Sequence, residues 1–174
     1  MDKIMLVRKW PISSRIFHWI SAVLLLITWL LILMYQNTDQ ELYIHLHKAF
    51  GLSILFWMLA RGLNRLLIKA PADVVMPLWQ KKISHLTHFA LYAILIAMPI
   101  AGLLTSVYGG HPIDMFGLFK IPVFVNPNSS AAHFYENIHT NIIWPMIITF
   151  TVLHIGAALY HQFILKDKLI NRMK

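Results

Sequence analysis

The chain has 174 residues, of which 58% are hydrophobic and 13% are charged, so it is too apolar for an ordinary soluble domain and is composed mostly of membrane spans. It contains ten histidines and no cysteine, which excludes disulfides, thiolate-bound zinc or iron–sulfur clusters, and haem attached through cysteine. The net charge of +8 does not indicate a nucleic-acid partner, because the basic residues are distributed by membrane side rather than gathered in one patch.

Four apolar stretches follow one another along the chain, each long enough to cross the hydrocarbon core of a bilayer, which is ~30 Å thick. The first covers about residues 16–35; it is too long for a cleaved signal peptide, and no small-x-small cleavage site follows it. The other three are expected at about residues 44–67, 84–107 and 138–165. We therefore predict an all-α membrane protein in which residues 1–174 form one domain, a bundle of four transmembrane helices.

The basic residues predict the orientation of this bundle. Thirteen of the fifteen Lys and Arg residues flank the spans on the side of both termini, and only Lys48 and Lys120 lie on the other side. Cytoplasmic segments of membrane proteins carry an excess of Lys and Arg. We therefore expect both termini in the cytoplasm. The longest connection, residues 108–137, then lies on the outer side, and its GG, HP, IP and NP pairs are turn signals.

The fourth span has no Lys, Arg, Asp or Glu, yet it contains histidines, which are costly in a membrane unless a site satisfies them. His139 and His154 are fifteen residues apart, or ~22 Å along a helix, which puts them near opposite faces of the membrane. His18 lies at the depth of His154, and His47 lies at the depth of His139. Two imidazoles from facing helices at each depth fit a six-coordinate haem b bound between the helices, and such a haem serves electron transfer.

The other histidines leave alternatives open. His45 is the alternative to His47 as the outer ligand, although a separation of two residues points the two side chains to different sides of the helix. A haem-free transporter in which histidines relay protons is a further alternative, which the absence of an inverted repeat disfavours. We interpret the remaining helix-end and loop histidines as solvated, with proton handling as the alternative for the first two: His85, His88, His111 and His133.

Four other residues are candidates for contacts with haem or quinone. Arg61 and Arg65 lie on one face at the cytoplasmic end of the second span, where they either pair with haem propionates or extend to the interface. Gly51 lies one turn after the outer ligand of that span, where a missing Cβ lets either a flat macrocycle or another helix approach. His161 follows the inner ligand of the fourth span by two turns and is placed to hydrogen-bond a quinone carbonyl or a propionate.

Four segments resemble the spans of the bacterial cytochrome b561 family: SSRIFHWISAV, LHKAFGLSILFWMLARGLNRL, HLTHFALYAILIAMPIAGLL and LHIGAALYHQFILKDKLINRM. The resemblance covers nearly the whole chain. It implies a small cytochrome of the bacterial inner membrane with two haem b groups and axial ligands at His18, His47, His139 and His154. The family includes a superoxide:ubiquinone oxidoreductase, so the resemblance also implies ubiquinone as substrate or acceptor.

Two features depart from the family pattern. The family usually spaces the two histidines of its fourth helix fourteen residues apart, whereas His139 and His154 are fifteen apart. We expect a π-type bulge near Pro145 to absorb the extra residue. The family also often ends Ala-Leu-x-His-His, whereas Gln162 follows His161 here, so no role of a second histidine carries over.

Together these features predict electron transfer between an outer, periplasmic donor and membrane quinone. In the enzymatic form of this function, superoxide is oxidised to oxygen and ubiquinone is reduced; the outer side has few basic residues, so this activity depends on the resemblance alone. The alternative is a non-catalytic haem b carrier or anchor subunit of another respiratory enzyme. No side chain is assigned a catalytic role. The expected partners are membrane lipid, quinone, and superoxide or another periplasmic redox donor, without nucleic acid.

Overall fold

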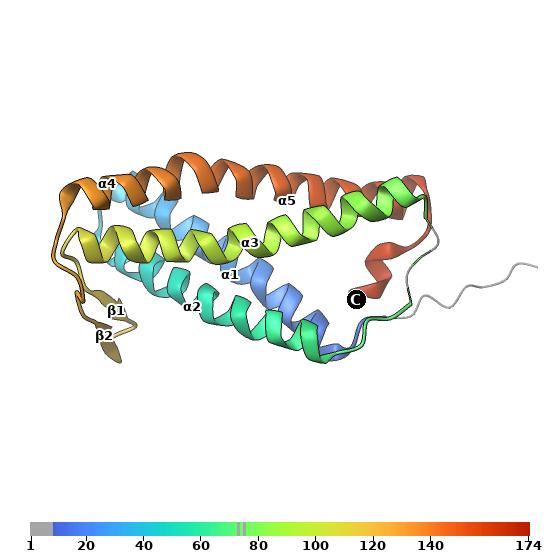
Figure 1. The fold of residues 1–174 in the computed structure, drawn as a ribbon, viewed down its shortest axis with the longest axis horizontal. Helices are drawn as coiled ribbons and strands as arrows, with labels where there is room; N and C mark the ends of the chain where they lie inside the picture. Colours follow the sequence, from blue (N-terminus) through green and yellow to red (C-terminus); the bar gives the residue numbers. More distant parts are fainter. Residues whose placement is uncertain (1–8, 73, 75) are drawn as a thin grey trace, which may run out of the picture.

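The computed structural model describes residues 9–174 except 73 and 75, and it consists of four long helical segments with a small hairpin at one end (Figure 1). Each of the four segments is long and apolar enough to cross a membrane, so the predicted all-α, four-span architecture is confirmed. The first three are α1 (Ile12–Thr38), α2 (Glu41–Leu67) and α3 (Leu78–Tyr108). The fourth runs without interruption through α4 (Ser129–Asn137), the π-helix η1 (Ile138–Ile143), α5 (Trp144–Leu159) and a second π-helix, η2 (Tyr160–Ile164).

The helices extend past the apolar stretches, because hydropathy marks only the part of a helix that is suited to lipid. Proline precedes α1 and α3, at Pro11 and Pro77, where its missing N–H breaks no helical hydrogen bond. Only Asp39 and Gln40 join α1 to α2, and Asp39 turns the chain with a left-handed φ of 53°. This short connection makes α1 and α2 antiparallel neighbours.

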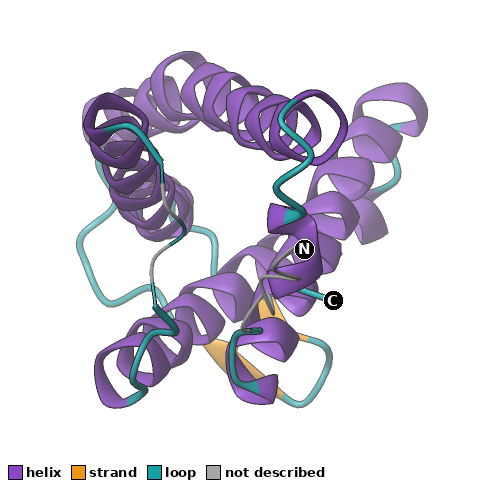
Figure 2. Ribbon diagram, turned by 90° about the vertical axis from the view of Figure 1, so that its right-hand side faces the viewer, coloured by secondary structure: helices purple, strands orange, loops and turns teal. Residues whose placement is uncertain are grey.

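The helices pack mainly on their neighbours in chain order. α1 packs on α2, α2 packs on α3, and α3 packs on α4, η1 and α5. Among the described residues, the backbones of α1 and α5 do not pack closely, and neither do those of α2 and η1. Figure 2, which looks along the bundle, shows the helices arranged as a ring around its axis. Any contact between the separated helices is therefore made across the bundle by side chains.

The fourth segment contains the widened turn that the sequence predicts near Pro145. In η1, the Trp144 N–H donates to the carbonyl of His139, five residues earlier instead of four. Pro145 has no N–H to continue the α-helical pattern, so the wide turn just before it accommodates a residue that could not make the usual bond. The π-helix adds one residue to the turn, which accounts for the fifteen-residue spacing of the two histidines.

The outer connection is more ordered than its turn signals alone indicate. β1 (Ile113–Met115) pairs antiparallel with β2 (Phe119–Ile121). The inward-facing Ile113 and Met115 are buried against Ala49 near the start of α2. This contact holds the hairpin against the bundle beside the first turns of α2 (Figure 1).

The fourth helical segment begins at Ser129, ahead of the apolar stretch that was expected to start at about residue 138. The side chain of Asn128 accepts a hydrogen bond from the Ala131 N–H at 3.0 Å and so caps the helix. The sequence before residue 138 is too polar to be recognised as part of a span, although its capping residue starts a helix.

The C-terminal tail folds back onto the end of the bundle where α1 begins (Figure 1). The tail contains a short 3₁₀ helix, η3 (Leu169–Arg172). Just after it, the Met173 carbonyl accepts a hydrogen bond from the Trp19 indole N–H at 2.8 Å. The Trp10 N–H donates to the carbonyl of Arg172 at 3.0 Å. The two ends of the described chain therefore lie together at the same end of the bundle.

Candidate functional site

One imidazole pair joins α2 to η1. The ring centroids of His47 and His139 lie 6.2 Å apart, with the ring planes at 83°. Nδ1 of His47 is 2.9 Å from the carbonyl oxygen of Thr28, and Nδ1 of His139 is 2.9 Å from that of Met98. A carbonyl oxygen only accepts, so each Nδ1 carries a proton and donates it. Each Nε2 is therefore unprotonated, which is the form that binds a metal.

The ring of His139 lies unusually close to the backbone of α3. A Cβ added to Gly102 would be 3.0 Å from Cε1 of His139, closer than carbon atoms normally approach. Only glycine at this position lets the ring sit where it does. Beside Gly51, by contrast, the nearest atom to an added Cβ is Cγ2 of Thr28 at 4.0 Å, so the surrounding space is otherwise open.

A second imidazole pair joins α1 to α5. The ring centroids of His18 and His154 lie 6.1 Å apart, with the ring planes at 66°. Arg61 reaches this pair from α2: its Nη2 is 3.3 Å from Nδ1 of His18, and its Nε donates to the Tyr92 hydroxyl at 3.1 Å. A guanidinium only donates, so in this arrangement Nδ1 of His18 accepts and Nε2 carries the ring proton; before Nε2 can bind a metal, that proton has to move to Nδ1 and Arg61 has to turn away from it. This pair is therefore surrounded by side chains, whereas backbone carbonyls hold the other pair.

The two pairs lie at separate depths along the bundle. On α1, His18 belongs to one pair and the Thr28 carbonyl holds a ring of the other, and these positions are ten residues, or ~15 Å, apart along the helix. The pair containing His18 lies toward the end where both termini meet, and is called the inner pair below. The pair of His47 and His139 is called the outer pair. The structure thus brings together the four histidines in the two combinations that their spacing predicts.

The separation of the rings fits an iron held between them. A metal bound at ~2 Å by one nitrogen of each of two facing imidazoles puts the ring centroids about 6 Å apart. Two imidazoles alone leave a metal with most of its coordination positions unfilled. In the described part of the chain, no group of three or more His, Asp or Glu is arranged to hold a metal ion. The pairs therefore suit an iron whose four remaining ligands come from a porphyrin.

Comparison with known proteins decides the family. Residues 9–174 match the model of the family described as prokaryotic cytochrome b561. The chain belongs to the prokaryotic cytochrome b561 family. Membership makes it a multi-pass bacterial membrane cytochrome that binds haem b, as the sequence predicts, and the two imidazole pairs supply ligands of the kind that such a cytochrome needs.

Three relatives align with this cytochrome over most of their length. It is 30% identical over 173 residues to cytochrome b561 homolog 2 of Escherichia coli K12, an alignment covering 95% of this chain and 90% of that protein. It is 31% identical over 165 residues to cytochrome b561 homolog 1 of the same organism, covering 90% and 91%. It is 29% identical over 168 residues to the probable superoxide oxidase CybB of Yersinia pestis, covering 90% of each.

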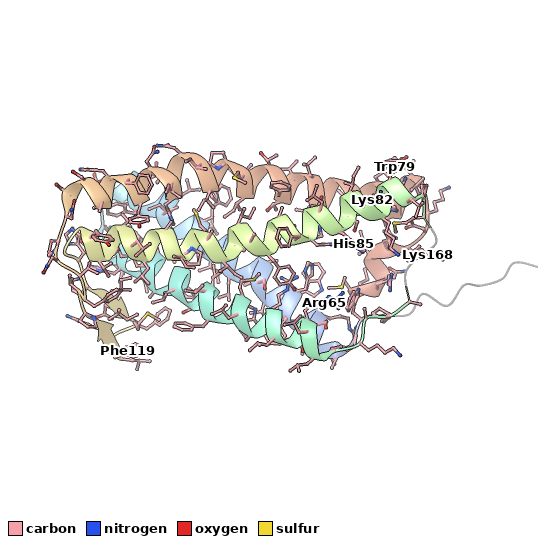
Figure 3. The ribbon with its side chains drawn as sticks, in the orientation of Figure 1. Arg65, Trp79, Lys82, His85, Phe119 and Lys168 are labelled. Atoms are coloured by element: carbon pink, nitrogen blue, oxygen red, sulfur yellow. The ribbon has the colours of Figure 1, made fainter. Side chains whose placement is uncertain are left out.

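Two residues that the sequence offers as candidates for haem contacts lie outside the pairs. His45 does not face the outer pair; its Nε2 lies 3.6 Å from Glu41 Oε2, one turn earlier on α2. Arg65 is at the inner end of the bundle (Figure 3), but its guanidinium lies over the Trp10 ring, 4.9 Å from the ring centroid. Arg61 is thus the arginine that the structure places against an imidazole of a pair.

His161 has a partner that was not anticipated. Its Nδ1 lies 2.5 Å from Oδ2 of Asp167, and both side chains are shielded, with exposed fractions of 13% and 24%. His161 is part of the π-helix η2, and Asp167 belongs to the tail that folds back from it. The pair therefore ties the tail to the inner end of the fourth segment, in the region where the sequence predicts a quinone or propionate contact.

His88 was also missed as a neighbour of the inner pair. It is an exposed residue, as expected for a helix end, yet its ring centroid lies 5.5 Å from that of His154. Tyr92, one turn further along α3, holds Arg61. His88 and Tyr92 are four residues apart and therefore lie on the same face of α3. This spacing is the sequence signal that could have placed both side chains at one site. His85, labelled in Figure 3, makes no ring contact with the pair among the described residues.

Proposed function

We propose that this cytochrome binds two haem b groups, one between His18 and His154 and the other between His47 and His139, and carries electrons between an outer donor and membrane quinone. The observation that supports the proposal is the presence of two imidazole pairs with centroid separations of 6.1 and 6.2 Å at separate depths. We also propose that residues 1–174 act as one unit, since both pairs combine residues from distant parts of the chain.

The chain's own residues favour electron transfer over binding of a gas or substrate at iron. With an imidazole on each side, a bound haem would have no iron position left open, and it would supply a one-electron redox couple. Gly51 leaves room beside the outer pair for a flat group, and Arg61, with Arg65 nearby, offers donors suited to propionate carboxylates at the inner pair.

The proposed direction follows from charge and from the position of the termini. We place both termini, and with them the inner pair, on the cytoplasmic side of the inner membrane, because thirteen of the fifteen Lys and Arg residues of the sequence flank the spans on the side of the termini. His161 and Asp167 then lie at the cytoplasmic end, where a quinone carbonyl could accept a hydrogen bond from Nε2 of His161 when the imidazole carries protons on both nitrogens. We propose ubiquinone as the acceptor there. Superoxide is the proposed outer donor, by analogy with the relative named as a probable superoxide oxidase.

The decisive test is the haem content of histidine variants. We expect two haems per chain in the unmodified protein, measured by the pyridine haemochrome assay against protein concentration. His18→Ala or His154→Ala removes the inner haem, and His47→Ala or His139→Ala removes the outer one, each with the other haem retained. His45→Ala is the matched control, because this neighbour of His47 faces Glu41 and keeps both haems.

Two results would contradict the proposal. One is a protein that binds no haem, or one haem that depends on all four histidines. The other is loss of the outer haem in His45→Ala with retention in His47→Ala. Superoxide-driven reduction of a soluble ubiquinone by the isolated protein then tests the enzymatic form. A protein with two haems that never reduces ubiquinone is instead an electron-carrying subunit.

A further inference from the structure

The two imidazole pairs differ in the hydrogen-bond partners of the ring nitrogens that would not bind iron. In the outer pair both Nδ1 atoms meet a backbone carbonyl at 2.9 Å. In the inner pair, Nδ1 of His18 faces the Arg61 guanidinium at 3.3 Å, and the His154 ring makes no hydrogen bond within the described part of the chain. Among the four histidines of the two pairs, His154 is therefore the one whose ring makes no hydrogen bond to any described residue.

A histidine that binds a metal almost always donates its second N–H to an acceptor, which fixes the ring and makes the ligand nitrogen more basic. His154 has three polar neighbours. His18 lies opposite His154 across the proposed iron position, so it is not available as a hydrogen-bond acceptor for His154. Arg61 has only N–H donors, so it cannot accept a hydrogen bond either. His88 is the third, and a neutral imidazole has one nitrogen that accepts.

The geometry of His88 suits this role. Two imidazoles joined through nitrogens ~3 Å apart have ring centroids roughly 5 Å apart. The observed separation between the ring centroids of His88 and His154 is 5.5 Å, with the rings at 70°, which is close to that spacing. On the other side, Nδ1 of His88 lies 3.5 Å from the Ser84 hydroxyl, one turn earlier on α3. The Ser84 hydroxyl can accept a hydrogen bond from the Nδ1–H of His88. Nε2 of His88 is then unprotonated and free to accept a hydrogen bond from His154.

We propose that His88 is a positioning residue for the inner haem ligand: its Nε2 accepts a hydrogen bond from the Nδ1–H of His154, and its own Nδ1–H donates a hydrogen bond to the Ser84 hydroxyl. This inference rests on the proposed function, since it requires a haem at the inner pair. The hydrogen bond makes the His154 imidazole more electron-rich, stabilises the ferric iron and lowers the reduction potential of the inner haem relative to a His154 without a partner. No equivalent side chain is needed at the outer pair, because backbone carbonyls accept the hydrogen bonds from both Nδ1 atoms there.

The experiment compares three variants in the full-length, haem-loaded protein. His88→Leu keeps much of the volume but cannot accept a hydrogen bond; His88→Gln restores an acceptor oxygen; His85→Leu removes a histidine from the same end of α3 that has no ring contact with the pair. The measurements are the haem content, the midpoint potential of each haem by redox titration, and the low-temperature EPR signal of each ferric haem.

We expect His88→Leu to raise the potential of the inner haem and shift its EPR signal while the outer haem stays unchanged. His88→Gln returns both toward the native values, and His85→Leu changes neither. An inner haem with native potential and EPR signal in His88→Leu would overturn the inference. If His88→Leu loses the inner haem altogether, His88→Gln decides: recovery of a native inner signal supports the inference, and failure to recover overturns it.

The design separates this inference from the proposed function. An unmodified protein with fewer than two haems contradicts the proposed function, and the inference falls with it. An unmodified protein with two haems, whose inner haem does not respond to His88→Leu, leaves the proposed function standing and rejects only the role of His88.

Discussion

The placement of His139 shows how a single missing side chain sets the geometry of a ligand. Its ring fits against α3 because Gly102 has no Cβ, and in that position its Nδ1 reaches the Met98 carbonyl, one turn before Gly102. A carbonyl oxygen has two lone pairs, so it can serve both the helix and the ring. The outer pair is thus aligned by backbone atoms, which do not change rotamer and which fix the ring orientation before any cofactor binds.

Replacing Gly102 tests this alignment. In Gly102→Ala the new methyl would lie 3.0 Å from the His139 ring, so the ring must move or the helices must separate, at a cost of ~1–3 kcal/mol. We expect the outer haem to be lost or its spectrum to change, with the inner haem retained and the melting temperature lowered. Gly156→Ala is the control, because nothing lies within 4 Å of a Cβ there. Equal haem content and spectra in the two variants would refute the role of Gly102.

The contact between His161 and Asp167 gives a second prediction at this scale. Its two side chains are largely shielded and 2.5 Å apart, and it joins η2 to the tail. Asp167→Asn removes the charge while keeping the shape, so we expect a loss of ~1 kcal/mol of stability and faster proteolytic trimming of the tail. Haem content stays at the native value, since neither residue belongs to an imidazole pair. Unaltered trimming of the tail would show that the hydrogen bonds from Trp19 and Trp10 to the tail carbonyls are enough to keep the tail in place.

At the scale of elements, the sequence predicts the spans and the depth at which histidines of different helices meet, and it misses contacts that depend on the rotation of one helix beside another. The four spans follow from hydropathy, and the widened turn near Pro145 follows from the spacing of two histidines in one helix. The carbonyl partners Thr28 and Met98 could not be predicted, because they depend on how a neighbouring helix is rotated about its axis. The same is true of His88, whose position at a helix end suggests solvent until α3 is placed beside α5.

The π-helix η1 offers a prediction about that element. Deleting Asn141 should convert η1 to an ordinary α-helical turn, so that the residues on either side of it keep their faces. Pro145 would then lie in a regular helix, where it costs ~3 kcal/mol, so the deletion is combined with Pro145→Ala. We expect this variant to keep both haems, with His139 and its inner counterpart fourteen residues apart.

An insertion at the same place is the matched contrast. One extra alanine after Asn141 turns the part of the helix that carries His139 by ~100° relative to α5, which moves this ring away from the outer pair. We expect the insertion variant to lose the outer haem and keep the inner one. If the deletion loses the outer haem as completely as the insertion does, η1 does more than add one residue to the spacing.

At the scale of the whole molecule, charge and architecture agree on one arrangement. The tail meets the start of α1, so both ends of the described chain lie at the end of the bundle that carries eleven of the thirteen Lys and Arg residues that the structure describes. The hairpin and the start of the fourth segment lie at the other end, with an exposed apolar tip at Leu118 and Phe119 (Figure 3). The inner pair, the arginines and the tail contact of His161 are gathered at the basic end. The orientation of the bundle therefore decides which pair would face the proposed periplasmic donor.

That orientation can be measured directly because the chain has no cysteine. Leu118→Cys places a thiol at the hairpin tip, where the native side chain is 82% exposed, and Lys82→Cys places one near the start of α3 at the opposite end. If the basic end is cytoplasmic, a membrane-impermeant maleimide labels Leu118→Cys in intact spheroplasts and labels Lys82→Cys only after permeabilisation. The unmodified protein, which has no thiol, controls for background, and haem content confirms that both variants fold. The reverse labelling pattern would put the outer pair on the cytoplasmic side, and the proposed flow of electrons from a periplasmic donor would then have to begin at His18 and His154.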